Sequence, residues 1–289
     1  MTPIETLAAF LAARDDAEHF VAPEMRSRLL PGTDGRVFVL MHGLTASPPA
    51  WDAIATALNA RGATVLSLRL PLHGYTDRLS TALLALTPDL LRRDLLDVLT
   101  AVAALGAPIT LAGHSLGGTL ALYGAAQSDS VDRVVAVAPY LGISFLPHET
   151  HVLLIPLINV LPNFFMWWDP VLRERQLPAH GYPRYPLHTL ATGLAIADAV
   201  YAHADRMPAA RAIDLVLNER ESSVNNRAAV HLAERWRAGG ASVAIHRLAG
   251  LPPSHDVIDP SRPNSSRVRD ALVGILCGEH VAEDRTLIL

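Results

Sequence analysis

The sequence predicts an α/β fold, in which a mostly parallel central sheet carries helices on both faces and an insertion covers one edge. Three observations predict it: short apolar runs typical of strands, segments of helical spacing between them, and one Pro-rich interruption of this alternation. Runs this apolar suit strands buried on both faces, as in a parallel sheet. The 289 residues allow one large domain or two small ones, and they can bury a sizeable core.

The first clear strand is expected at 36–41 (RVFVLM), directly after the turn-forming segment PGTDG. Five more apolar runs are expected to be strands: 63–70, 108–113, 133–138, 213–217 and 242–248. Helical spacing predicts helices at 50–60, 88–105, 116–127, 225–238 and 266–277. Strands that alternate with helices in this way are connected by right-handed crossovers. Residues 20–35 carry no clear signal.

The alternation stops between about residues 140 and 207, where Pro and large apolar residues are frequent. This span predicts an insertion of mostly helices and loops, laid as a cap over one edge of the sheet. We therefore expect a core formed by residues 1–139 and 209–289, and a cap formed by residues 140–208.

Composition excludes several classes of function. The chain has 28 acidic and 24 basic residues, and its net charge of -4 argues against a nucleic-acid-binding protein. It contains no lysine, which excludes a Schiff-base lysine and a P-loop lysine. Its single cysteine, Cys277, excludes a disulfide framework and a multi-cysteine metal site. We expect no metal and no cofactor.

No run of 18 apolar residues is present, so the sequence predicts no membrane span and no stable membrane insertion. The first 20 residues contain too many acidic residues for a secretory signal, and they are read as an amphipathic helix. We therefore expect a soluble, cytoplasmic protein. The sequence makes no prediction of its oligomeric state.

The strongest motif is GHSLGG (113–118), a G-x-S-x-G sequence between a predicted strand and a predicted helix. So tight a turn strains the backbone of its central residue, and it leaves no room for side chains two residues before and after. Gly113 and Gly117 supply that clearance. Ser115 is then exposed above the sheet as a candidate nucleophile, at a helix N-terminus that favours negative charge. The alternative is a glycine-rich turn with an incidental serine.

The motif HGLT (42–45) follows the first clear strand and predicts part of an oxyanion hole. Acyl transfer requires two backbone N–H groups aimed at the developing oxyanion. We expect these donors to be Leu44 and Leu116, the residue after the candidate nucleophile. Gly43 permits the turn, and His42 is interpreted as a structural histidine.

With these motifs the chain resembles the α/β-hydrolase superfamily, most closely its serine carboxylesterases and monoacylglycerol-lipase-like members, which are grouped with serine aminopeptidases. The resemblance is carried by HGLTASP (42–48), GHSLGG (113–118) and LPLHG (70–74). The last matches the family's P-G-H-G turn, with Leu72 in place of a glycine. It covers roughly residues 36–140 and 210–277 and implies an α/β-hydrolase fold. The cap matches no family motif.

The resemblance implies the chain order serine, acid, histidine. The base should lie after the last strand, where His255 occupies the loop PPSHD. Other histidines lie within a predicted helix (His231), within a predicted strand (His246) or in the tail (His280). His255 is therefore the candidate general base, and its alternative is a solvated loop histidine.

The acid should follow the penultimate strand, in the family's pattern of Gly, two residues, Asp, two residues, Val. Here the stretch is NERESSV (218–224), in which Glu221 stands for the aspartate. A glutamate can accept the imidazole N–H and stabilise the charged ring. Glu219 is the nearest alternative. Asp214 lies at the wrong end of its strand, and Asp256 is interpreted as a loop cap.

The cap contains four large aromatic residues that could wall a pocket for an acyl chain: Phe164, Phe165, Trp167 and Trp168. The alternative is ordinary packing of the cap on the core. Together these features predict a cofactor-independent serine hydrolase of carboxylic esters, a carboxylesterase or a monoacylglycerol-lipase-like enzyme, with a Ser-His-Glu triad and an acyl-enzyme intermediate. Its expected partner is a small-molecule ester with an apolar acyl group. A thioesterase, a C–C hydrolase, an aminopeptidase and a non-catalytic binding protein on this fold remain alternatives.

Overall fold

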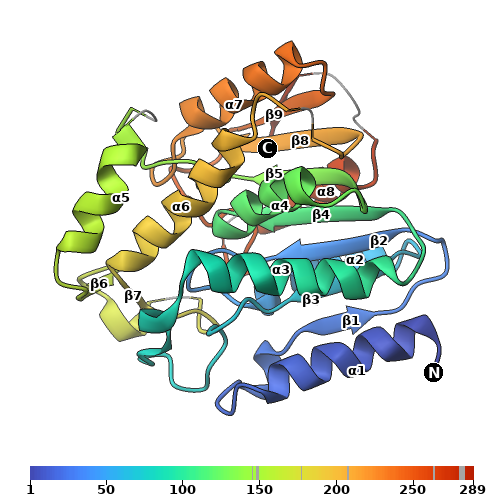
Figure 1. The fold of residues 1–289 in the computed structure, drawn as a ribbon, viewed down its shortest axis with the longest axis horizontal. Helices are drawn as coiled ribbons and strands as arrows, with labels where there is room; N and C mark the ends of the chain where they lie inside the picture. Colours follow the sequence, from blue (N-terminus) through green and yellow to red (C-terminus); the bar gives the residue numbers. More distant parts are fainter. Residues whose placement is uncertain (145, 148–149, 177, 207, 263, 280–283) are drawn as a thin grey trace.

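The central element of the fold is a sheet of eight strands among the described residues, with the order β1-β3-β2-β4-β5-β8-β9-β10 (Figure 1). The structure is a computed structural model that describes residues 1–289 except 145, 148–149, 177, 207, 263 and 280–283. Within this sheet, as far as the described residues form it, β1 alone runs antiparallel to its neighbour. The strands are β1 (Arg28–Leu30), β2 (Val37–Met41), β3 (Thr64–Leu68), β4 (Ile109–His114), β5 (Val131–Val137), β8 (Ala212–Asn218), β9 (Val243–Ala249) and β10 (Arg285–Ile288).

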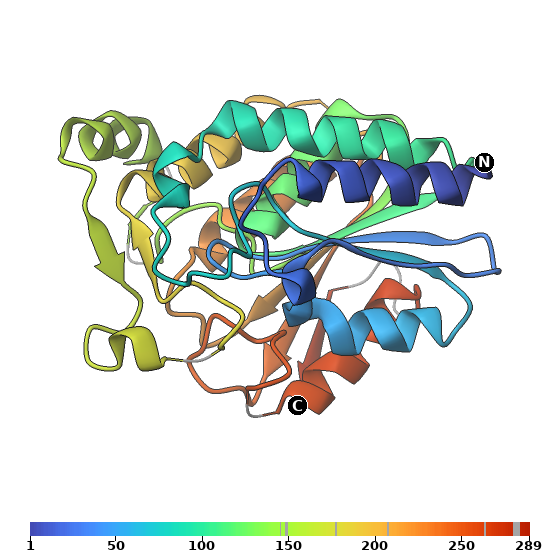
Figure 2. The same cartoon turned by 90° about the horizontal axis from the view of Figure 1, so that it is seen from below.

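Helices pack on both faces of this sheet, as Figure 2 shows from below. Apolar residues of one set of helices form a core with one face of the strands: α1 (Pro3–Asp16), α3 (Pro88–Ala103), α4 (Leu116–Gln127), α6 (His188–Ala202) and α7 (Asn226–Ala238). The second core, on the other face, includes α2 (Asp52–Asn59) and α8 (Ser265–Leu276). Because both faces are covered, β2 is buried at every residue, as its apolar run predicts.

The six strands and five helices that the sequence predicts are all present, with bounds shifted by a few residues, and the N-terminal helix is also confirmed as α1. Strands β1 and β10 were not predicted from the sequence. Both lie at the edges of the sheet, and their residues are mostly exposed or half-buried. An edge strand has one neighbour and needs no continuous apolar run, so it leaves a weak pattern.

The parallel arrangement brings four distant loops to one edge of the sheet. Strands β2, β4, β8 and β9 all run in the same direction. Their carboxyl ends therefore place the loops 42–47, 114–115, 218–225 and 250–264 at the same edge. In an open α/β sheet, ligands bind in the crevice outside the carboxyl ends of the strands.

The described residues of the span 140–208 include two α-helices, a short 3-10 helix (Arg173–Arg175) and a small sheet. Helix α5 (His151–Val160) leads to β6 (Phe165–Trp167), which pairs antiparallel with β7 (Arg184–Pro186). This hairpin-like pair was not predicted. Helix α6 packs along α4, and its Ile196, Ala197 and Val200 are part of the main core. The C-terminal part of the predicted cap is thus packed on the core, while the division of the chain into core and cap stays a prediction.

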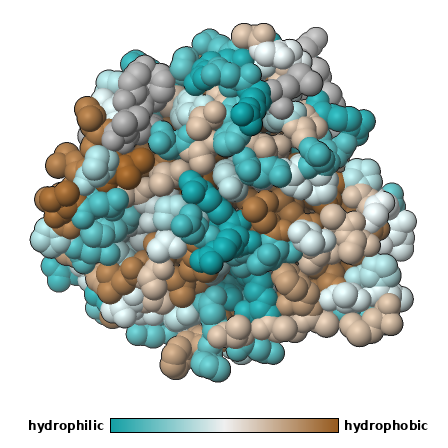
Figure 3. Space-filling view, in the orientation of Figure 1, coloured by the Kyte–Doolittle hydropathy of each residue, from teal (hydrophilic) through white to brown (hydrophobic). Residues whose placement is uncertain are grey.

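Large apolar side chains are exposed on α5 and on the segment that follows it, at the left of the view in Figure 3. They are Leu153, Leu157, Val160, Leu161, Phe164, Val171 and Leu172. Within the part of the chain that the structure describes, no helix has both the length and the apolar character to cross a membrane.

A buried ion cluster lies near the amino end of β8, away from the converging loops. Asp214 Oδ2 accepts hydrogen bonds from Arg133 Nε and Nη2 at 2.9 and 2.7 Å, and Oδ1 lies 2.7 Å from His246 Nε2. All three side chains are almost completely buried. This placement agrees with the interpretation that Asp214 stands at the wrong end of its strand for the site.

We expect Asp214→Ala to lower the free energy of unfolding by about 3–5 kcal/mol, because it leaves a buried guanidinium without a carboxylate. Urea denaturation measures this loss. Asp132→Ala is the matched control, since its partner Arg211 is mostly exposed and such pairs contribute little. Equal losses in the two variants would contradict a structural role for the Asp214 cluster.

Candidate active site

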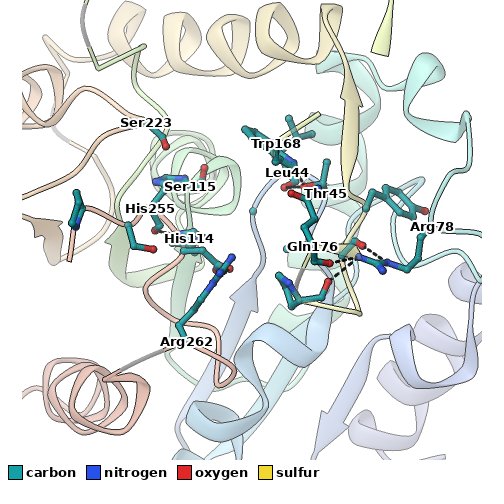
Figure 4. Close-up of a pocket in the computed structure, with 18 residues that line it drawn as sticks. Leu44, Thr45, Arg78, His114, Ser115, Trp168, Gln176, Ser223, His255 and Arg262 are labelled. Atoms are coloured by element: carbon teal, nitrogen blue, oxygen red, sulfur yellow. Dashed lines mark hydrogen bonds and ion pairs between the residues drawn. The ribbon is translucent and has the colours of Figure 1, made fainter. Parts of the chain in front are cut away.

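A cavity of about 340 Å³ opens where the four loops converge. Its lining comes from the loop after β2, the turn between β4 and α4, the loops after β8 and β9, and described residues of the segment 168–182 (Figure 4). The cavity size lies at the lower end of the range for small-molecule sites. Four candidate residues predicted from the sequence line it: Ser115, His255, Leu44 and Trp168.

Ser115 sits on the strained turn that its motif predicts. Its φ and ψ are 54° and −118°, a conformation that costs a non-glycine residue energy. A Cβ on Gly113 would lie 2.1 Å from the carbonyl oxygen of Gly117, and a Cβ on Gly117 would lie 2.3 Å from that of Met41. The clearance argument is therefore confirmed at both positions. Leu116 begins helix α4 directly after the serine, at its N-terminus.

Glu221 and His255 meet although 34 positions separate them. Glu221 Oε2 lies 3.1 Å from His255 Nδ1, and the glutamate side chain is only 1% exposed. The other oxygen, Oε1, accepts hydrogen bonds from the backbone N–H groups of Ser222 and Ser223 at 2.9 and 2.7 Å. Glu219 is exposed, and the structure gives it no contact with His255. Of the two glutamates, the structure brings only Glu221 to the imidazole.

The Glu221 carboxyl is held in its ionised form. Burial alone would raise its pKa, but the hydrogen bond and the charge of His255, together with the backbone donor of Ser223, lower it overall. A charged carboxylate at Nδ1 holds the proton of the imidazole on that nitrogen. The other ring nitrogen, Nε2, is then left as an acceptor.

His114, the residue directly before Ser115 in the G-x-S-x-G motif, supports the loop that carries His255. Its Nε2 donates to the backbone carbonyl of His255 at 2.8 Å, and the two rings lie 4.8 Å apart. Burial, followed by the positive charge that His255 can carry, lowers the pKa of His114 to about 4. This contact was not predicted, because no local sequence pattern links positions 114 and 255.

Asn218, which replaces the family's glycine, makes a second long-range contact to the same loop. Its side-chain amide donates to the backbone carbonyls of Pro252 and Ser254 at 3.1 and 2.8 Å. The side chain is buried, and it ties the end of β8 to the residues just before His255. The sequence shows that Asn218 replaces the family's glycine, but it does not show that Asn218 contacts the loop before His255.

The loop that carries Leu44 lies against the nucleophile turn. A Cβ on Gly43 would approach Ser115 Cβ to 3.2 Å, so the two backbones are close. His42 is fully buried, and its Nε2 accepts a hydrogen bond from the Leu70 N–H at 3.0 Å. His42 does not line the cavity, in agreement with its interpretation as a structural histidine.

Of the four cap aromatics, only Trp168 lines the cavity. Phe165 and Trp167 lie against the guanidinium of Arg184, whose carbon is 4.2 and 5.8 Å from the two ring centroids. Phe164 is 53% exposed. These three residues pack within the cap or face solvent, and they do not line the cavity.

Asp256 and Leu72, two residues singled out in the sequence, lie in loops of the core. Asp256 Oδ2 pairs with Arg262 Nε at 3.1 Å at the rim of the cavity. Leu72, at the position of a family glycine, has a φ of +65°, so it adopts the conformation for which glycine is usual. Among the described residues, no group of three His, Cys, Asp or Glu side chains is arranged to hold a metal ion.

Comparisons with known proteins agree with this architecture. The sequence profile described as "Alpha/beta hydrolase family" matches residues 38–283. No curated protein matches the chain by sequence.

Solved structures share the fold at low sequence identity. One of two metagenome-derived lipolytic enzymes, LipS and LipT, is 17% identical, with 89% of this chain and 99% of that chain covered and a TM-score of 0.67. The monoacylglycerol lipase of Paleococcus ferrophilus is 18% identical over 87% of this chain and 98% of that chain (TM-score 0.64). A soluble variant of monoglyceride lipase from Saccharomyces cerevisiae is 13% identical over 89% and 92% (TM-score 0.63).

The lowered pKa of His114 makes a prediction for acid stability. Between pH 6.5 and about 4 the unfolded chain binds a proton at His114 that the folded protein excludes, so the free energy of unfolding falls as the pH drops. We expect His114→Gln to lose less stability than the wild type between pH 7 and pH 4.5, as measured by urea denaturation. The exposed His19 provides the control, His19→Gln, which should keep the wild-type pH dependence. An unchanged pH dependence in His114→Gln would contradict a neutral, buried His114.

Proposed function

This chain belongs to the alpha/beta hydrolase family, and from that premise we propose that it is a cofactor-independent serine hydrolase of carboxylic esters. The observation that carries the proposal is the hydrogen bond between Glu221 and His255, in a cavity that the strained Ser115 also lines. Nucleophile, base and acid in this order form the triad that activates a serine hydroxyl. A serine at the turn also argues against dehalogenases and epoxide hydrolases, which use an aspartate there.

In the proposed reaction, Ser115 Oγ attacks the ester carbonyl while His255 accepts the hydroxyl proton at Nε2. Glu221 holds the imidazole in the tautomer with Nδ1 protonated, and its charge stabilises the imidazolium that forms. The lowered pKa of Glu221 supports this role, because the carboxylate is charged at neutral pH.

The negative charge of the tetrahedral intermediate is stabilised by the backbone N–H groups of Leu44 and Leu116. Leu116 is the first residue of helix α4, so the helix dipole adds to its donor. The imidazolium of His255 then protonates the leaving alcohol, and an acyl-Ser115 intermediate remains. Water, deprotonated by His255, hydrolyses this intermediate and returns the free hydroxyl.

For the substrate we propose a small ester with an apolar acyl group. The lining supports this choice through Leu44 and Trp168 on one side, while Ser223 and Arg262 give the opposite rim a polar character (Figure 4). Residues 140–208 act as the cap in this proposal, since Trp168 and the segment that follows it close one side of the cavity. A thioesterase, a C–C hydrolase and an aminopeptidase would use the same triad, and substrate panels distinguish them.

We expect Ser115→Ala to abolish hydrolysis of p-nitrophenyl butyrate while it leaves the fold intact. The measurement is release of p-nitrophenol, together with labelling of the pure protein by a fluorophosphonate probe. Wild type should be labelled, and Ser115→Ala should not. If the wild type is not labelled, or if the variant is labelled equally, a non-catalytic binding protein on this fold is the better description.

The two glutamates of the acid loop provide a matched pair of variants. Glu221→Gln should lower kcat by about 10⁴-fold, because an amide at this position favours the wrong imidazole tautomer. Glu219→Gln should change kcat by less than about threefold, since an exposed side chain without a contact to His255 contributes little. A large loss in Glu219→Gln with none in Glu221→Gln would exclude Glu221 as the acid.

A further inference from the structure

We propose that the cap segment 168–182 holds the oxyanion-hole loop, residues 43–47, in its working geometry, with Trp168 and His180 as positioning residues. This inference rests on the proposed function, because it concerns the Leu44 donor of that mechanism. It goes further in giving the cap a part in the chemical step. Four groups of observations support it.

The first is strain within the oxyanion-hole loop. The loop forms a turn that is closed by a hydrogen bond from the Ala46 N–H to the Gly43 carbonyl, at 3.2 Å. Thr45, at the third position of this turn, has a φ of +67°. Glycine is usual at such a position, and a β-branched residue there is strained. A strained turn persists only where neighbouring structure stabilises it.

The second group of contacts comes from the cap to Thr45. Trp168 Nε1 donates to Thr45 Oγ1 at 2.8 Å, and that hydroxyl donates to the Leu44 carbonyl at 2.6 Å. The backbone N–H of Tyr182 donates to the Thr45 carbonyl at 2.8 Å. The cap therefore fixes the carbonyl groups on both sides of Thr45. The Leu44 N–H shares its peptide plane with the Gly43 carbonyl, which accepts the hydrogen bond from Ala46 that closes the turn. Contacts that hold this turn at Thr45 therefore also restrict the direction of the Leu44 N–H.

The third group anchors the far end of the loop. Ser47 Oγ donates to the His180 carbonyl at 2.7 Å and lies 3.1 Å from His180 Nδ1. His180 Nε2 in turn lies 2.6 Å from Asp259 Oδ2. Ser47 and Asp259 are both buried. The hydrogen-bonded line Ser47–His180–Asp259 thus joins the oxyanion-hole loop and the cap to the loop that follows His255.

The fourth contact holds the cap segment itself in place. Arg78, from the core loop before α3, donates from Nε to the Gly181 carbonyl at 2.8 Å and from Nη2 to the Gln176 carbonyl at 3.0 Å. Figure 4 shows Arg78, Gln176 and Trp168 on the side of the cavity opposite His255. Arg78 therefore ties the cap segment to the core at two residues that lie in the sequence between Trp168 and Tyr182, the two cap residues that contact Thr45.

These contacts have a kinetic consequence. The Leu44 N–H is most important in the transition state, where the oxyanion is charged. A displaced donor therefore lowers kcat more than it raises KM, whereas loss of an apolar wall of the cavity raises KM.

The test compares variants of Trp168 and Thr45 with p-nitrophenyl butyrate as substrate. We expect Trp168→Phe, which keeps an aromatic ring and removes the N–H, to lower kcat about 10-fold or more and to change KM less than about threefold. Thr45→Val should cause a similar loss, and Thr45→Ser should keep more kcat than Thr45→Val. The double variant Trp168→Phe/Thr45→Val should lose little more than either single variant, because both remove the same link.

A matched control separates this effect from loss of stability. Trp51 is a buried tryptophan whose indole nitrogen has no hydrogen-bond partner in the described parts of the chain. Trp51→Phe makes the same chemical change and should lower the melting temperature without lowering kcat at 20 °C. His180→Gln serves as a second positioning variant and should again lower kcat more than it changes KM.

Fluorophosphonate labelling of the wild type separates the possible failures. If the wild type is neither labelled nor active, the proposed function fails and this inference fails with it. If the wild type is labelled and active, but Trp168→Phe keeps its kcat or changes KM alone, the inference fails and the proposed function stands. Additive losses in the double variant would also overturn it.

Discussion

The structure depends on a close approach of two backbones at the turn between β4 and α4. Gly113 and Gly117 come so near that a side chain on either would overlap main-chain atoms. The same clearance lets α4 begin directly against the end of β2, since Gly117 also faces the Met41 carbonyl. The strain at Ser115 is thus maintained by the packing of this turn on itself and against the end of β2. The loop after β2 and the loop after β4 cannot move independently, and the candidate nucleophile and the Leu44 loop are fixed relative to each other.

The position of His255 depends on contacts from two separate strands. Asn218 and Glu221, at and after the end of β8, hold the loop and the imidazole, and His114, at the end of β4, donates to the His255 carbonyl. Two of these neighbours, Glu221 and His114, differ in their charge at neutral pH. Glu221 is held charged, whereas burial keeps His114 neutral. In the proposed mechanism, a second positive charge 4.8 Å away would oppose protonation of His255, and a neutral His114 removes that penalty.

The cap is closely connected to the core. Helix α6 completes the main core beside α4, and the segment 168–182 forms hydrogen bonds with the oxyanion-hole loop. The aromatic residues of the cap differ in their surroundings. Trp168 lines the cavity, whereas Phe165 and Trp167 pack on Arg184 within the cap. A cap with such contacts can influence the donors of the site as well as the shape of the pocket.

The sequence by itself determined the order of the six central strands and of the helices between them, the strained turn at Ser115 and the loop that holds His255. These features have local signatures: apolar runs, helical spacing and two glycines at a fixed distance from a serine. The tertiary structure decided which of two nearby glutamates meets the imidazole, because the path of the loop turns Glu221 toward it and leaves Glu219 exposed. It also decided the roles of Asn218 and Trp168. Their hydrogen bonds join residues 34 to 123 positions apart, and a contact over that distance leaves no periodic or local pattern in the chain.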